Sequence, residues 1–175
     1  MASTYDIVKD FERRYPQTVC WRVKKHCALI DQNLNNQERV LYAFAAQNDL
    51  THGSIFNTAV LALTNERIII AQDRILVGYK VSTITPDQYN DMQINAGIIW
   101  GTVTIDTLKE TVFFSNISKK ALPEIQIQIS SFMIEAKKKY HSKEKDSNWI
   151  LFFKKGVVKN EKILFVYKYY FINIY

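Results

Sequence analysis

The sequence predicts a mainly β fold of the α+β class. In this fold, a seven-stranded antiparallel barrel or sandwich is closed by a C-terminal helix and preceded by two N-terminal helices. Two observations support this prediction. Between residues 38 and 115, short runs with a two-residue apolar period alternate with polar turns, as in antiparallel strands. The segments before and after this region instead carry apolar residues at helical spacing.

Two amphipathic helices are predicted first, at residues 3–15 and at 18 to about 34. Pro16 ends the first helix, and the polar string Asn33 to Asn36 ends the second. A first strand follows at residues 38–45, where Val40, Tyr42 and Phe44 share one face.

The strongest local signal is the hairpin predicted at residues 55–63 and 67–71. Apolar, largely β-branched runs flank the polar turn Thr64-Asn65-Glu66-Arg67. In such a turn Asn65 can adopt a positive φ, and Thr64 can bond the nearby backbone. The hairpin is therefore expected to have one well-buried face.

The remaining strands are predicted at residues 78–84, 89–94, 100–106 and 111–115. Gly97 lies in the turn before residue 100, where a positive φ is expected. The closing helix, at about 119–140, has Pro123 and Glu124 in its first turn and lysines at its C-terminal end. Its apolar stripe is formed by Ile125, Ile129, Phe132, Met133 and Ala136.

The net charge of +6 is unevenly distributed along the chain. Residues 36–117 carry a net charge of −3, whereas residues 1–35, 118–140 and 141–175 carry +2, +3 and +4. If the N-terminal helices pack beside the closing helix, their basic residues could together face an anionic surface, although solvated helix faces are the simpler interpretation. No aromatic residues are interleaved with these charges, so nucleic acid is not an expected partner. The residues concerned are Arg13, Arg14, Arg22, Lys24, Lys25, Lys119, Lys120, Lys137, Lys138 and Lys139.

No residue is assigned to catalysis, to a cofactor or to a metal. Cys20 and Cys27 lie about two turns apart on the predicted second helix, too far for a disulfide, and are interpreted as small buried residues. His26 adjoins Cys27, but no second Cys/His cluster completes a tetrahedral metal site. His52 has an acid and a hydroxyl nearby, as many polar loops do. The common glycine-rich phosphate-binding motifs and the zinc-protease motif are absent from the sequence.

The C-terminal segment 141–175 is rich in aromatic and basic residues. Three explanations remain open: an extra hairpin added to a sheet edge, an interfacial anchor, or an extension that reflects AT-rich coding DNA. The predicted organisation is thus an N-terminal helical extension at 1–35, a domain at 36–140 and an aromatic and basic C-terminal extension at 141–175. The aromatic residues are Trp149, Phe152, Phe153, Phe165, Tyr167, Tyr169, Tyr170, Phe171 and Tyr175.

Four segments carry a family resemblance. They are E-R-V-L at 38–41, L-T-N-E-R-I-I-I at 63–70, G-I-I-W-G-T-V-T-I at 97–105 and the closing helix. Together they resemble the bacterial pleckstrin-homology-like (PH-like) family usually called YokE-like, over about residues 36–140. The resemblance implies a PH-like barrel and a small non-enzymatic module of low-GC Gram-positive bacteria and their prophages.

In PH domains that bind phosphoinositides, basic residues cluster in the first, third and sixth interstrand loops. The corresponding loops here, at about 47–54, 72–78 and 106–110, have a net charge of −2. This charge repels a polyanionic headgroup, so phosphoinositide binding is not expected.

The expected function is therefore a cytoplasmic, non-enzymatic interaction module without a cofactor. It would bind a protein or peptide, or another copy of itself, through a groove or a strand edge. The alternative is peripheral membrane association through the basic helices and the aromatic-basic tail, without a phosphoinositide pocket. No apolar run of membrane-spanning length and no signal-peptide-like start is found, so neither spanning nor export is expected.

Overall fold

The structure is a computed structural model that describes residues 2–49, 56–74 and 78–138. Helices α1 (Thr4–Arg14) and α2 (Val23–Gln32) precede the sheet. After it, the 3-10 helix η1 (Lys119–Ala121) leads into a closing helix that starts at residue 122 and is described to residue 138. The tail at 141–175 lies outside the described residues. The strands are β1 (Val40–Gln47), β2 (Thr58–Thr64), β3 (Ile68–Asp73), β4 (Tyr79–Ile84), β5 (Tyr89–Ala96), β6 (Trp100–Thr107) and β7 (Thr111–Ser118).

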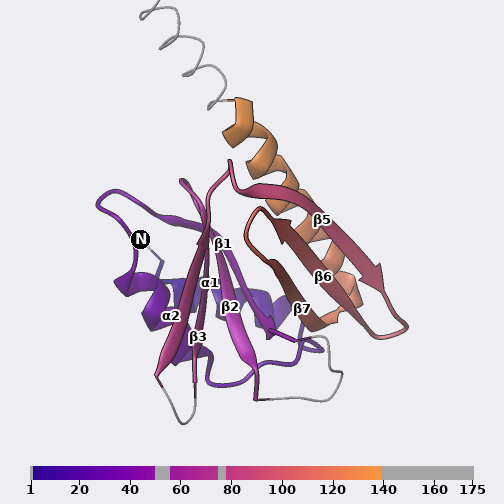
Figure 1. The fold of residues 1–175 in the computed structure, drawn as a ribbon. Helices are drawn as coiled ribbons and strands as arrows, with labels where there is room; N and C mark the ends of the chain where they lie inside the picture. Colours follow the sequence, from indigo (N-terminus) through magenta and orange to yellow (C-terminus); the bar gives the residue numbers. More distant parts are fainter. Residues whose placement is uncertain (1, 50–55, 75–77, 139–175) are drawn as a thin grey trace, which may run out of the picture. The chain divides into compact units, whose positions relative to one another are not determined.

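The seven strands form one antiparallel sheet in the order β4-β3-β2-β1-β7-β6-β5 (Figure 1). Strands β1 to β4 pair along their lengths, as do β5 to β7. Among the described residues, the two groups are joined by one register pair, Gln47 with Ser115. The sheet is therefore curled into a half barrel, and the predicted fold class is confirmed.

The predicted hairpin is formed by β2 and β3, whose side chains are almost all buried. Thr64 Oγ1 accepts hydrogen bonds from the backbone N–H groups of Glu66 (3.1 Å) and Arg67 (3.0 Å), as predicted. Asn65 does not adopt the anticipated positive φ. Its Oδ1 instead accepts from the N–H of Arg39 (2.8 Å), which ties the turn to the start of β1.

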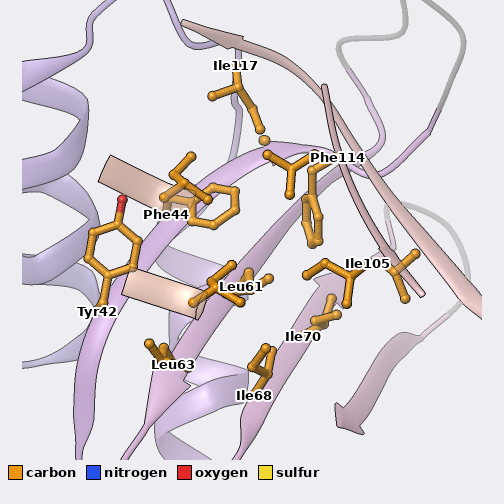
Figure 2. Close-up of a cluster of buried hydrophobic side chains, with 14 of the residues drawn as sticks. Tyr42, Phe44, Leu61, Leu63, Ile68, Ile70, Ile105, Phe114 and Ile117 are labelled. Carbon is orange, nitrogen blue, oxygen red and sulfur yellow. The ribbon is translucent and has the colours of Figure 1, made fainter. Parts of the chain in front are cut away.

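The main core lies on the inner face of the curled sheet (Figure 2), and residues of the closing helix belong to the same cluster. Alternate residues of β1, β2, β3 and β6 point into it, which is the period of a strand with one face in the core. The closing helix contributes Ile125, Ile129 and Met133, which are buried as predicted, whereas Phe132 and Ala136 are half-buried. The sheet contributes Tyr42, Phe44, Leu61, Leu63, Ile68, Ile70, Ile105, Phe114 and Ile117.

A second apolar cluster lies on the other face of β1, β2 and β3, where α1 and α2 pack. Small strand residues dominate this face, so the helices can approach the sheet closely. This second layer explains why β2 is buried along its whole length. The helices contribute Val8, Val23, Cys27 and Ile30, and the strands contribute Ala43, Ala45, Val60, Ala62, Ile69 and Ala71.

One residue of α1 also reaches the main core. Phe11 is fully buried, and its ring centroid lies 5.7 Å from that of Phe44 and 6.2 Å from that of Tyr42. One turn further, the Tyr15 hydroxyl donates to Glu124 in the closing helix (2.7 Å). The end of α1 thus connects β1 to the closing helix.

The second helix is shorter than predicted, because it starts at Val23 and not at Thr18. Residues 18–21 are held outside the helix by hydrogen bonds to the sheet: Thr18 Oγ1 accepts from the Ser118 N–H (3.0 Å), and the Trp21 N–H donates to Thr58 Oγ1 (2.9 Å). The assignment of Cys20 to this helix is therefore wrong. Local apolar spacing favoured a helix, but long-range partners for the backbone determine the conformation.

The turn between β5 and β6 depends on glycine for a reason other than the predicted one. Gly97 does not have a positive φ. A Cβ at this position would lie 2.7 Å from the carbonyl oxygen of Trp100, to which the Gly97 N–H donates (2.8 Å). Glycine is needed here because the backbone approaches so closely.

Candidate binding groove

A hollow of about 720 Å³ lies between α1 and the start of α2. One wall is a face of α1, and the other is formed by the segment before α2 and by its first turns. We call this hollow the α1–α2 groove. Its lining residues are Tyr5, Lys9, Glu12, Cys20, Trp21, Arg22, Val23, Lys24, Lys25 and Ala28.

The extended segment at residues 18–21 positions Trp21 in this groove. The Val19 carbonyl accepts from Gln47 Nε2 (3.0 Å), and the same amide also donates to Thr58 Oγ1 (2.9 Å). Together with the bond between Trp21 and Thr58, these contacts fix the segment to the ends of β1 and β2. The Trp21 side chain is 48% exposed and makes an edge-on ring contact with Phe56. A large aromatic surface is thus held in place and open to solvent.

The start of α2 is fixed to the end of β3. Arg22 precedes the helix with a φ of 54°, an uncommon conformation for a residue with a side chain. Its guanidinium forms an ion pair with Asp73. The Asp73 N–H donates to Nδ1 of His26, which is buried (2.7 Å). The charge of Arg22 is therefore compensated within the protein.

We expect His26 to make the free energy of unfolding decrease as the pH falls below about 6.5, the ordinary histidine pKa. Burial lowers the pKa of His26 in the folded protein, and its Nδ1 must stay unprotonated to accept the Asp73 N–H. The unfolded chain therefore binds the proton first, and this contribution is present at higher pH and is lost as the pH falls.

Urea unfolding between about pH 8 and pH 5 measures this effect. The matched variant is His26→Asn, whose Oδ1 can accept the same N–H without titrating in this range. We expect a shallower pH dependence for the variant. Equal slopes for the two proteins would contradict the assignment.

The rim of the groove carries uncompensated positive charge. Lys9 pairs with Glu12 on α1 (2.5 Å). Lys24 and Lys25 are exposed, and neither forms an ion pair with any residue in the described ranges. The groove therefore combines aromatic surface with two lysines that remain free to meet carboxylates.

The two cysteines are free thiols. Burial raises the pKa of Cys20 to about 12, and the carboxylate of Glu12, which accepts its hydrogen bond (3.2 Å), acts in the same direction. Burial likewise raises the pKa of Cys27 to about 12. Both thiols stay protonated near neutral pH, so Cys20 forms part of the groove wall and is not an activated nucleophile.

Comparison with protein families identifies the fold. A family model described as Bacterial PH domain matches residues 34–131, more than half of the chain. The chain belongs to the bacterial PH domain family. No curated protein matches it. The PH-like fold fits an interaction module, and PH-like domains are generally non-enzymatic.

The match covers β1 to β7 and part of the closing helix of this bacterial PH domain. Every residue that lines the α1–α2 groove precedes residue 34. The groove is therefore built by the part of the chain that the family model does not match.

Acidic side chains near the first, third and sixth interstrand loops of this PH domain form ion pairs or hydrogen bonds within the protein. Asp73 pairs with Arg22, and Glu110 pairs with Lys80 of β4 (3.6 Å). Asp49 accepts from Asn57 Nδ2 (3.1 Å). Residues 50–55, which include His52, and 75–77 lie outside the described ranges, so the expectation of no phosphoinositide site stays a prediction.

The predicted basic residues lie in several places. Arg22, Lys24 and Lys25 come together at the groove. At the other end of α1, Arg13 pairs with Asp10 (2.9 Å), and Arg14 pairs with both Asp10 (3.1 Å) and Glu124. A common role of the predicted basic residues at an anionic surface stays a prediction. Lys119 and Lys120 lie on η1, Lys137 and Lys138 belong to a second compact unit (137–175), and Lys139 lies outside the described residues.

Two other kinds of site are absent from the described residues. No group of three or more His, Cys, Asp or Glu side chains in these ranges is placed to hold a metal ion. No described helix combines the length and the apolar character needed to cross a membrane.

Proposed function

We propose that this bacterial PH domain is a non-enzymatic interaction module that binds an acidic peptide segment of a partner protein in the α1–α2 groove. The observation that carries the proposal is the combination of exposed Trp21 with the unpaired Lys24 and Lys25 along one hollow. The YokE-like segments support placement in that subfamily. The two free thiols support a cytoplasmic location, because reducing compartments favour them.

The groove has the properties of a peptide site. Its volume falls within the usual range of ligand pockets, which is enough for a few side chains. Trp and Tyr are enriched among the residues that dominate binding energy, and Trp21 and Tyr5 supply both types here. A peptide with an apolar residue flanked by glutamates would place that residue against Trp21 and its carboxylates near Lys24 and Lys25.

Fluorescence polarisation with short labelled peptides, each holding one aromatic or aliphatic residue between glutamates, tests this proposal on the full chain. We expect Lys24→Glu/Lys25→Glu to weaken binding by about tenfold, since each exposed charge pair contributes up to roughly 1 kcal/mol. Added salt should weaken binding by the wild-type protein more than by the variant.

The matched control is Lys119→Glu/Lys120→Glu, which makes the same charge change outside the groove. It should leave peptide affinity unchanged. An equal loss of peptide affinity in both double variants would contradict the proposed site. So would equal affinity for peptides that carry glutamine in place of glutamate.

A further inference from the structure

The turn between β5 and β6 exposes three consecutive large apolar residues. Ile98 is 94% exposed, Ile99 49% and Trp100 44%. The turn lies at the end of a hairpin that projects from the sheet (Figure 1). Exposed apolar clusters of this kind mark interaction sites.

Two lysines lie directly beside this turn. Trp100 of β6 pairs with Ser118 of β7, and Lys119 and Lys120 follow Ser118. The Lys119 N–H donates to the carbonyl of Ile99 (3.0 Å), which fixes η1 against the turn. Both lysines are exposed, and within the described part of the chain neither forms an ion pair.

Trp100 has the environment of an interfacial tryptophan. Its indole N–H donates to the carbonyl of Gln17 (2.7 Å), so the polar group is satisfied while part of the ring stays exposed. This bond also brings the segment after α1 next to the turn. Asp10 of α1 and Glu124 of the closing helix are already paired with arginines of α1.

We propose that the β5–β6 turn is a membrane-contact site that inserts Ile98 and Ile99 into the interface of an anionic bilayer while Lys119 and Lys120 meet the lipid headgroups. The charge of the lysines matches an anionic surface, and apolar side chains beside basic ones are the pattern of interfacial binding. The site goes beyond peptide binding in the groove, because it is built from different elements.

The proposed contact also differs from a headgroup pocket in the first, third and sixth interstrand loops. Because β1 pairs antiparallel with β7, the β1–β2, β3–β4 and β6–β7 turns share one end of the sheet order, and the β5–β6 turn lies at the other end. The acidic character of the β6–β7 turn therefore does not oppose it.

Vesicle flotation of the full chain tests the proposal, with phosphatidylcholine vesicles and with equimolar phosphatidylcholine and phosphatidylglycerol vesicles. We expect binding to the anionic vesicles only. Ile98→Ser should weaken this binding by about tenfold, because it removes most of one inserted side chain. Lys119→Gln/Lys120→Gln should weaken it by at least about tenfold at low salt.

Matched controls are available in the same chain. Leu108→Ser changes an apolar residue that is 68% exposed in the β6–β7 turn, and Lys24→Gln/Lys25→Gln makes the same charge change at the groove. Both should bind vesicles as the wild type does, whereas the groove variant should lose peptide affinity. The two proposals can therefore fail independently.

Three outcomes would overturn the membrane site: equal effects of Ile98→Ser and Leu108→Ser, equal binding to neutral and anionic vesicles, or no vesicle binding by the wild type. Sedimentation velocity then identifies the occupant. Self-association that Ile98→Ser abolishes would assign the turn to a second copy of the chain.

Discussion

Replacing Phe11 with alanine is expected to lower the free energy of unfolding of the whole sheet by about 3–5 kcal/mol. Phe11 is fully buried, although it belongs to a helix that precedes the first strand by many residues. Its ring packs on Phe44 and Tyr42 of β1 inside the main core. The substitution therefore leaves a cavity in that core and does not simply loosen a surface helix.

Urea unfolding followed by circular dichroism measures this effect on the full chain. Phe56→Ala is the matched control, because Phe56 is 62% exposed and its loss should cost less than about 1 kcal/mol. If the two variants lose similar stability, α1 is an appendage to the PH domain and not part of its core.

Replacing Arg67 with methionine is expected to cost about 3–5 kcal/mol, because it leaves a buried carboxylate without its cation. The Glu38 side chain is fully buried, and Arg67 donates to it from both Nε and Nη2 at 3.0 Å. Thr64 Oγ1 (2.7 Å) and the Asn35 N–H (2.8 Å) donate to the same carboxylate. Without Arg67, these two neutral donors must hold the charge alone.

The control Arg39→Met removes an exposed arginine that follows Glu38 in the sequence. It should change the free energy of unfolding by less than about 0.5 kcal/mol. The double variant Glu38→Leu/Arg67→Met should recover part of the loss, since a buried ion pair replaced by apolar groups is often neutral. Equal losses for the single and double variants would show that the unpaired charge is not the cause.

The same pair sets a pH dependence. Burial acts to raise the pKa of Glu38, but hydrogen bonds from Arg67, Asn35 and Thr64 outweigh it and lower the pKa in the folded state. The stabilisation is therefore present above the ordinary carboxyl pKa and is lost as the pH falls through the lowered value. Arg67→Met should remove this acid-side contribution.

Most of the sheet was predictable because strand signals are local. Alternating apolar residues and polar turns specify β1 to β7 without knowledge of their partners, and the Thr64 turn forms the local bonds that its residue types favour. The errors occur where distant groups decide. Residues 18–21 have helical apolar spacing, but the N–H groups of Val19 and Trp21 and the Thr18 side chain form hydrogen bonds to the sheet.

The groove and the turn were harder to predict for a related reason. Charge alone indicates Lys24 and Lys25, but Tyr5 and Trp21 become their neighbours only when α1 packs beside α2. Isoleucine is usually buried, so the sequence alone does not indicate that Ile98 and Ile99 are exposed. Nothing local indicates that their hairpin extends beyond the core. The conformation of Arg22 has no signal in the sequence, because bulky residues rarely adopt a positive φ.

The single pair between Gln47 and Ser115 has a consequence for how the chain folds. Within each group of strands, every strand pairs with its neighbour in the sequence, so these contacts close short loops at low entropic cost. The pair between β1 and β7 instead closes a loop that holds most of the domain, and few native contacts compensate that cost at once. We therefore expect the two local meanders to form before they join, and the joining to limit the rate of folding. Because Phe11 packs on Phe44 of β1, close to this junction, we expect Phe11→Ala to speed unfolding of the joined state, which stopped-flow unfolding in urea measures.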